Sequence, residues 1–180
     1  MSRLDITREL RDEHDLILEW ADLIEELARR SRGSFEESPL AAHFPVVDEF
    51  LEAYSDTFHH AKEEDILFGS LERVISHCGP IPVMLREHEI GRALRHRMGE
   101  AFHGRDLERL LVASLDFCEL LTQHIAKEND ILYPMAEQGI PDDERLPIQE
   151  AYAAAARHLG AGALRVRFER ERDALRAMLG

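Results

Sequence analysis

The sequence contains little cysteine and almost no strand signal. Its two cysteines, Cys78 and Cys118, occur in unrelated contexts without CxxC spacing. They indicate neither a disulfide framework nor a thiolate zinc site, and both are predicted to be buried or idle thiols. Apolar residues recur instead at helical spacing, between short breaks that contain glycine or proline. The chain is therefore predicted to be all-α.

Long hydrophobic runs and an excess of positive charge are also missing. No apolar stretch approaches the roughly 20 residues that span a bilayer, and residues 1–6 lack the apolar core of a signal peptide. Lysine and arginine number 22 against 36 aspartate and glutamate, a formal net charge of -14. Such a surface repels nucleic-acid phosphates and anionic membranes. We expect a cytoplasmic protein that binds small molecules, cations or a protein partner, and neither nucleic acid nor membranes.

Six segments show helical periodicity. They cover about residues 6–30, 45–68, 82–102, 106–137, 142–158 and 162–178. The second is expected to begin near Pro45, because proline is tolerated in the first turn of a helix. Four long helices with short connections favour an antiparallel up-down-up-down four-helix bundle. We predict this bundle over residues 1–139, and a C-terminal helical extension over residues 140–180 that packs on the same domain.

One ten-residue phrase occurs twice, at residues 59–68 and 124–133, with seven identical positions. Each copy has histidine and glutamate four residues apart, which places an imidazole and a carboxylate on one helix face. These pairs are His59 with Glu63 and His124 with Glu128. Two exposed helices could share a Lys-Glu pattern by chance, but that alternative leaves both histidines unexplained. The offset of 65 residues predicts two similar helix hairpins, whose facing pairs could hold two metal ions.

Two further histidines, His14 and His88, lie in phase with the apolar stripes of their helices. An imidazole buried without a partner costs roughly 1–3 kcal/mol, and a metal ion supplies such a partner. Either residue alone is more often satisfied by a hydrogen bond, but one in-phase histidine on each long helix favours metal. Histidines expected to be solvated or capping are His43, His77, His96 and His103. His158 stays a candidate, because its segment could return to one end of the bundle.

Four histidines and two glutamates form a nitrogen and oxygen donor set. It suits iron, manganese or zinc and lacks the soft sulfur that copper(I) prefers. Six donors exceed the four of a tetrahedral zinc ion. Two octahedral ions bridged by Glu63 and Glu128 would use all six donors and leave positions open for a small molecule. Nearby aromatic residues could shield the centre from water, but at helical spacing they are more often plain core: Tyr54, Phe58, Phe117 and Tyr133.

Motifs in all four long segments, in the expected order, resemble those of the hemerythrin family, above all its bacterial HHE cation-binding members. They are His14, His59-His60-x-x-Glu63, Met84-Leu85-x-x-His88-Glu89, and His124-x-x-x-Glu128 followed by Leu132-Tyr133-Pro134. The resemblance covers about residues 6–137. It implies a four-helix bundle around a non-haem centre of two iron ions, with an oxo or hydroxo bridge, that binds dioxygen. It implies as terminal ligands His14, His59, His88 and His124, and as bridges Glu63 and Glu128.

Two positions depart from the oxygen carriers of that family. Met84 stands where they have a second histidine, and Glu128 follows its histidine by four residues where they have an aspartate at five. One iron is then left with an additional open position, unless His60 fills it. We expect His60 either as a metal ligand or as a hydrogen-bonding support for one.

Three functions stay open, and the sequence does not decide whether the chain is an enzyme. The first is binding of dioxygen or a related diatomic ligand, for storage or sensing. The second is a di-iron redox enzyme that decomposes peroxide or oxidises iron. The third is a regulatory module whose fold depends on iron, because metal binding and folding are coupled.

Overall fold

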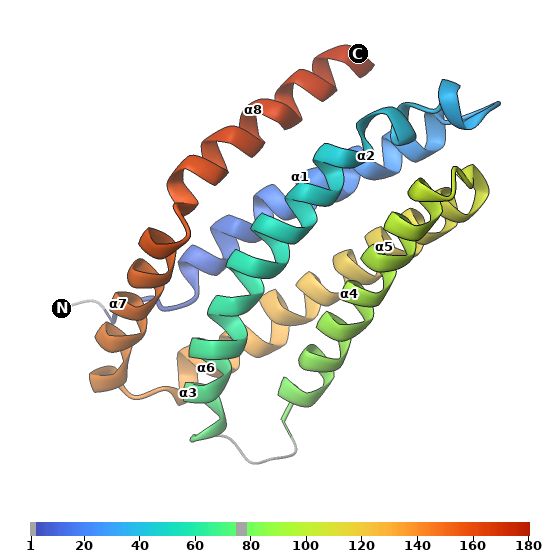
Figure 1. Cartoon of the computed structure of the whole chain (residues 1–180). Coiled ribbons are helices and arrows are strands. Elements are labelled where there is room, and N and C mark those ends of the chain that lie inside the picture. The colour runs from blue at the N-terminus through green and yellow to red at the C-terminus, as the bar shows by residue number, and fades with distance from the viewer. Residues whose placement is uncertain (1–2, 75–78) are drawn as a thin grey trace.

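Helices make up the regular structure of the computed structural model, which describes residues 3–74 and 79–180 (Figure 1). The long helices are α1 (Arg8–Arg30), α2 (Pro39–Phe50), α4 (Ile81–His103) and α5 (Leu107–Lys127). Two of them are prolonged: α2 by η2 (Leu51–His60), η3 (Glu63–Leu67) and α3 (Phe68–Glu72), and α5 by η4 (Glu128–Leu132) and α6 (Tyr133–Gly139). The remaining helices are η1 (Phe35–Glu37), α7 (Asp142–His158) and α8 (Ala161–Leu179). No strand occurs in these two described ranges.

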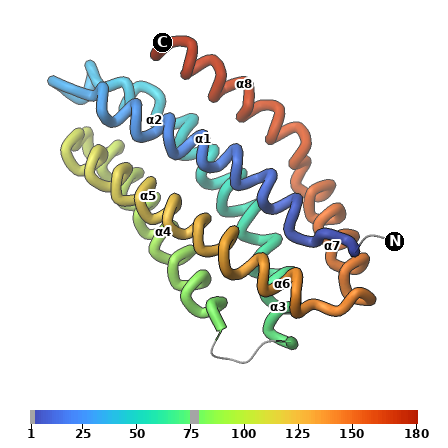
Figure 2. The backbone as a smooth tube through the Cα atoms, turned by 180° about the vertical axis from the view of Figure 1, so that it is seen from behind, coloured from blue at the N-terminus to red at the C-terminus, as the bar shows by residue number. Residues whose placement is uncertain are grey.

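The four long helices run alternately in opposite directions, as Figures 1 and 2 show from two sides. α1 packs against α2 and α5, and α4 packs against α5. Figure 1 places the turn from α1 to α2 and the turn from α4 to α5 at the same end of the bundle. The predicted all-α up-down-up-down bundle is confirmed.

The second long helix begins earlier than predicted. It starts at Pro39, and Pro45 lies inside it. Ser38 is the N-cap, and its side chain accepts a hydrogen bond from the backbone N–H of Ala41. Serine at the N-cap and proline at the first helical position are both preferred at the start of a helix. Pro45 lies six residues further along the helix and is exposed.

Buried side chains form two apolar clusters. The larger surrounds Trp20, Phe50 and Phe117. The smaller includes Leu10, Met84 and Tyr133. On each long helix the predicted metal-binding residues lie in sequence between members of the two clusters, so a layer of buried polar groups crosses the bundle.

The C-terminal helices lie against the bundle, and α8 runs along α1 and η2 (Figure 1). Phe168 of α8 is fully buried and packs edge-on against Trp20, with ring centroids 6.1 Å apart. Arg167 also pairs with Glu49 of α2. These contacts cover the outside of α1 and η2. The division of the chain at residue 139 stays a prediction.

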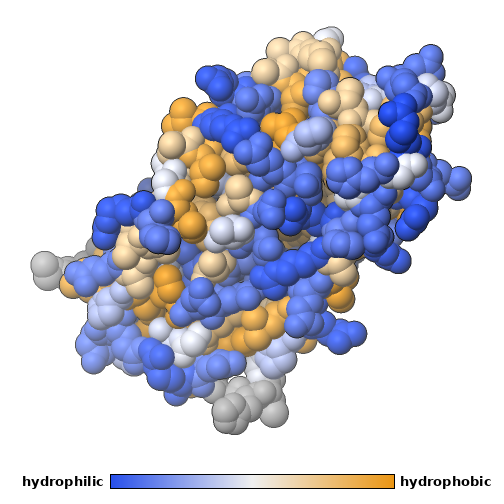
Figure 3. Space-filling model, in the orientation of Figure 1, coloured by the Kyte–Doolittle hydropathy of each residue, from blue (hydrophilic) through white to orange (hydrophobic). Residues whose placement is uncertain are grey.

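The face seen in Figure 3 is largely hydrophilic, with apolar side chains scattered over it. None of the described helices combines the length and apolar character needed to cross a bilayer. Cys118 is a buried free cysteine, and burial raises the pKa of its thiol. An idle thiol was the prediction for this residue. Cys78 and His77 lie outside the described residues.

Candidate metal centre

Buried histidines and glutamates from all four long helices and their continuations meet in the polar layer. Among the described residues they form two groups, in each of which one ligand atom per residue lies within 4.8 Å of the others. The first group is His14, His59, Glu63 and Glu128, and the second is His60, Glu63, His88 and His124. Every member is buried. The structure thus brings together all seven residues predicted from the sequence.

Glu128 faces both groups. Its Oε2 lies 3.2 Å from Nε2 of His14. Its Oε1 lies 3.2 Å from Nε2 of His124 and 3.8 Å from Nε2 of His88. A carboxylate with one oxygen toward each group has the placement expected of a bridge between two ions.

Glu63 belongs to both groups. Its Oε2 lies 3.6 Å from Nε2 of His59 and 3.5 Å from Nε2 of His88. Its Oε1 accepts a hydrogen bond of 2.6 Å from the hydroxyl of Tyr133. That hydroxyl also lies 3.2 Å from Nε2 of His14. The ring of Tyr133 lies in the core as predicted, but its hydroxyl enters the polar layer, because helical spacing places a ring without showing where its hydroxyl points.

Every imidazole in the layer has a supporting oxygen at its Nδ1. The pairs are His14 with Asn129 at 3.0 Å, His59 with Glu13 at 2.9 Å, His60 with Asp56 at 3.2 Å, His88 with Glu64 at 2.7 Å and His124 with Glu87 at 3.0 Å. Carboxylate and amide oxygens accept hydrogen bonds, so we assign the ring proton to Nδ1 in each case. Each Nε2 is then free to bind a metal, as in metal sites whose histidines are oriented by such partners.

The inner atoms of the layer lack donors. Three buried carboxylate oxygens have no hydrogen-bond partner: Glu63 Oε2, Glu128 Oε1 and Glu128 Oε2. Nε2 of His88 and Nε2 of His124 lie only 2.9 Å apart. Lone pairs that face one another in a buried layer are unfavourable unless a cation lies among them. The residues present therefore fit bound metal ions.

Burial shifts the pKa values of three groups in the layer toward their neutral forms. It lowers the pKa of His60 to about 4 and that of His59 well below its ordinary value. Both imidazoles are then neutral near pH 7, which is the form that coordinates metals. Burial, reinforced by the charge of Glu128, raises the pKa of Glu63 well above its ordinary value. An ionised carboxylate at this position requires a compensating positive charge.

The two copies of the repeated phrase build the same chain of contacts. In each, a histidine Nδ1 donates to a carboxylate of another long helix, and that carboxylate also accepts from the lysine three residues after the histidine. The chains are His59–Glu13–Lys62 and His124–Glu87–Lys127. Glu13 and Glu87 directly precede His14 and His88 in α1 and α4. The two helix hairpins are thus similar in their supporting contacts as well as in their inner residues.

The backbone of the two copies is also alike from the shared glutamate onward, whereas before it the first copy continues a ten-residue π-helix and the second an α-helix. η3 begins at Glu63 and η4 at Glu128, and both are π-helical over five residues. π-helical turns are rare and occur frequently at functional sites. The hydrophobic periodicity predicts ordinary helix for these segments. The repeated phrase therefore specifies a wide turn that starts at the shared glutamate as well as the donor atoms themselves.

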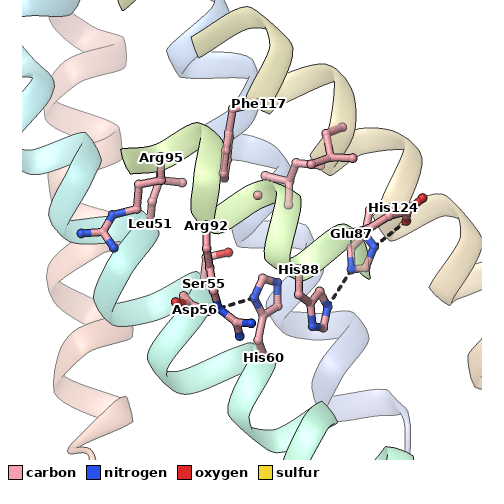
Figure 4. Close-up of a pocket in the computed structure, with 13 residues that line it drawn as sticks. Leu51, Ser55, Asp56, His60, Glu87, His88, Arg92, Arg95, Phe117 and His124 are labelled. Atoms are coloured by element: carbon pink, nitrogen blue, oxygen red, sulfur yellow. Dashed lines mark hydrogen bonds and ion pairs between the residues drawn. The ribbon is translucent and has the colours of Figure 1, made fainter. Parts of the chain in front are cut away.

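A cavity adjoins the second group. Its volume is about 30 Å³, which is room for a water-sized molecule. His60, His88 and His124 line it together with apolar residues such as Leu51 and Phe117 (Figure 4). A small ligand in this cavity would lie directly beside three histidines.

The other histidines lie outside the two groups. His96, His103 and His158 are exposed, and His43 is half-buried in the middle of α2. His43 is thus neither at a helix end nor in a loop. His158 is absent from both groups formed by the described residues.

Comparison with known families gives one result. Residues 5–136 match the model of the hemerythrin HHE cation-binding domain. No curated protein and no solved structure matched the chain. The matched segment runs through α1, α2, α4 and α5 and the continuations of α2 and α5, and it includes all five buried histidines. The chain therefore belongs to the hemerythrin HHE cation-binding family and is a metal-binding helical protein.

Proposed function

We propose that this chain is a non-haem di-iron protein that binds dioxygen or a related small diatomic ligand, for storage or sensing. The observation that carries the proposal is the pair of buried donor groups joined by two carboxylates. One ion would be held by His14 and His59, the other by His60, His88 and His124. Glu63 and Glu128 would join them. Iron is proposed because the family resemblance implies it and the donor set suits it.

Met84 cannot supply the histidine ligand that the oxygen carriers have at this position. We propose that His60 takes its place, so that the second ion keeps the same number of ligands. The His60 ring stacks on His88, with centroids 3.8 Å apart and planes inclined by 14°. Met84 is buried in the smaller apolar cluster, where an imidazole stands in the oxygen carriers. The imidazole that Met84 does not supply would therefore come from His60 of η2 instead of from α4.

When bound, iron supplies an open position for a small ligand and can change its oxidation state. The chain's own residues do the rest. The supporting oxygens orient the imidazoles, and the two apolar clusters exclude water from either side of the layer. The cavity beside His60, His88 and His124 gives a small molecule a place next to the second ion.

The proposal is tested by iron content and optical spectra. The purified chain is loaded anaerobically with iron(II), and spectra are recorded as dioxygen is admitted and then removed. About two irons per chain, with charge-transfer bands that reverse on degassing, support the proposal. Less than one iron per chain, or the same content in a His59→Ala, His124→Ala double variant, overturns it.

A redox enzyme that decomposes peroxide or oxidises iron is the second candidate. The observation that favours it is the buried Tyr133 hydroxyl, which is hydrogen-bonded to Glu63 and could pass a proton to it. Bands that decay at once to a ferric state, with turnover of hydrogen peroxide that Tyr133→Phe slows, would support this candidate. Reversible binding without turnover would reject it.

A further inference from the structure

Arg92 of α4 links two of the supporting carboxylates. Its Nε lies 2.8 Å from Oδ1 of Asp56, and its terminal nitrogen lies 2.6 Å from Oε1 of Glu64. In Figure 4 its side chain extends from α4 toward Asp56 and His60. The same two oxygens accept hydrogen bonds from Nδ1 of His60 and Nδ1 of His88. One guanidinium thus fixes the acceptors of two stacked imidazoles.

These contacts concern only one of the two metal positions. His60 and His88 belong to the second group and to no other. In the first group, the acceptor of His59 is paired with Lys62, and the acceptor of His14 is the neutral amide of Asn129. Among its described contacts, Arg92 has no link to the first group.

A planar guanidinium suits this role because it donates to two carboxylates in fixed directions, which an ammonium group does less well. The Arg92 side chain is 40% exposed, whereas that of Lys62 is 0% exposed. Solvent therefore reaches the cation that supports the second position, whereas the lysine that supports His59 in the first position is buried. The second position also adjoins the cavity.

We propose that Arg92 is a positioning residue for the metal position of His60, His88 and His124, and that this position releases its ion before the other does. The inference rests on the proposed function, because it takes both groups to hold iron. Replacing residues that orient metal-bound histidines typically weakens metal binding about 10–100-fold. The effect should be confined to one ion of the pair.

Arg95 provides the matched control. It lies three residues further along α4, lines the same cavity and pairs with Asp48 at 2.7 Å and Glu52 at 3.1 Å. Neither of these carboxylates contacts an imidazole among the described residues. Arg92→Gln and Arg95→Gln therefore remove the same charge from the same wall, and only the first removes support from a histidine.

The experiment is a competition between iron(II)-loaded protein and a chromogenic iron(II) chelator under anaerobic conditions. The wild type should release its two irons in two phases. In Arg92→Gln, the first phase should occur at a chelator concentration about 10–100-fold lower, and the second phase should occur at the same concentration as in the wild type. Arg92→Lys should lie between, and Arg95→Gln should match the wild type. Single-phase release by the wild type, an equal shift of both phases, no shift, or an equal shift in Arg95→Gln overturns the proposal.

Imidazole NMR of the metal-free proteins separates this inference from the proposed function. Less than one iron per chain in the wild type would reject the di-iron proposal. Arg92→Gln should still change the Nδ1–H signals of His60 and His88 and leave that of His59 unchanged. Unchanged signals for His60 and His88 would reject the role of Arg92, whatever the iron content. Should Arg92→Gln fail to fold, Arg92→Lys serves in both measurements.

Discussion

The two copies of the repeated phrase form the same π-helical turn and the same inner pair, yet their sequences differ at three positions. His60 corresponds to Ile125, Glu64 to Asn129, and Phe68 to Tyr133. The identical positions supply what both metal positions need: a histidine, a glutamate and a supporting lysine. The differing positions add an imidazole and an acidic acceptor to one side and a phenol to the other. The identical positions of the repeat therefore form the polar layer, and the three positions that differ make the two metal positions unequal.

Burial separates the copies further. Lys62 and Lys127 make equivalent contacts with Glu13 and Glu87. Lys62 is fully buried beneath α7, with its ammonium group 5.4 Å from the ring centre of Tyr152, whereas Lys127 is 35% exposed. The C-terminal extension thus seals one copy and leaves the other in contact with water.

Replacing each lysine by methionine should give the largest difference in stability between the two copies. Lys62→Met leaves the carboxylate of Glu13 without its cation in a buried place, which should lower the free energy of unfolding by about 3–5 kcal/mol. Lys127→Met affects a partly exposed pair and should cost less than about 1 kcal/mol. Urea denaturation of the metal-free variants measures both. Equal losses would show that burial by α7 does not distinguish the copies.

His60→Ile makes the first copy resemble the second. It removes an imidazole that only the second group uses, so iron content should fall from two to one per chain. The stabilisation given by the lost ion, about 2.7 kcal/mol at a free iron concentration 100 times its dissociation constant, should be lost as well. Iron analysis and thermal unfolding with and without iron test this. A variant that keeps two irons would show that His60 only supports His88.

Glu128→Leu removes the carboxylate whose two oxygens lie next to histidines of both groups. It should abolish binding of both ions. The metal-free variant should nevertheless be more stable than the metal-free wild type by about 1–3 kcal/mol, because two unpartnered buried oxygens disappear. Iron analysis and urea denaturation give the two values. A less stable metal-free variant would mean that Glu128 is already satisfied without metal.

Tyr133→Phe makes the second copy resemble the first and should have a small effect. The hydrogen bond to Glu63 is lost, which should cost about 1 kcal/mol of stability in the metal-free protein. Iron content should stay at two per chain, because the imidazoles and carboxylates remain. Urea denaturation and iron analysis decide the outcome. Loss of one iron would instead make Tyr133 part of the donor set.

Much of the fold follows from local sequence pattern. The helical periodicity predicted six helical segments, and the structure confirms them with one displaced start. At that start, Pro45 and Pro39 are both acceptable first-turn residues, and the cap at Ser38 decides between them. The seven predicted metal-site residues could be selected because five of them lie in the repeated phrase, and His14 and His88 lie in phase with apolar stripes.

The supporting residues could not be predicted in the same way. Glu13, Lys62 and Arg92 are charged residues at helical spacing, which in a sequence are typical of exposed ion pairs. Their partners lie on other helices, at separations such as 49 residues for Lys62 and Glu13. Only the rotation of each helix in the bundle determines which charged side chains face the layer. The hydroxyl of Tyr133 was missed for the same reason.

Both metal positions are divided between the two halves of the bundle. The first group takes His14, His59 and Glu63 from the N-terminal hairpin and Glu128 from the other hairpin. The second also combines residues of both hairpins. During synthesis, the N-terminal hairpin is made first and contains neither complete set. Bound metal would therefore mark a chain whose two halves have already met, and it would join them as a cross-link does.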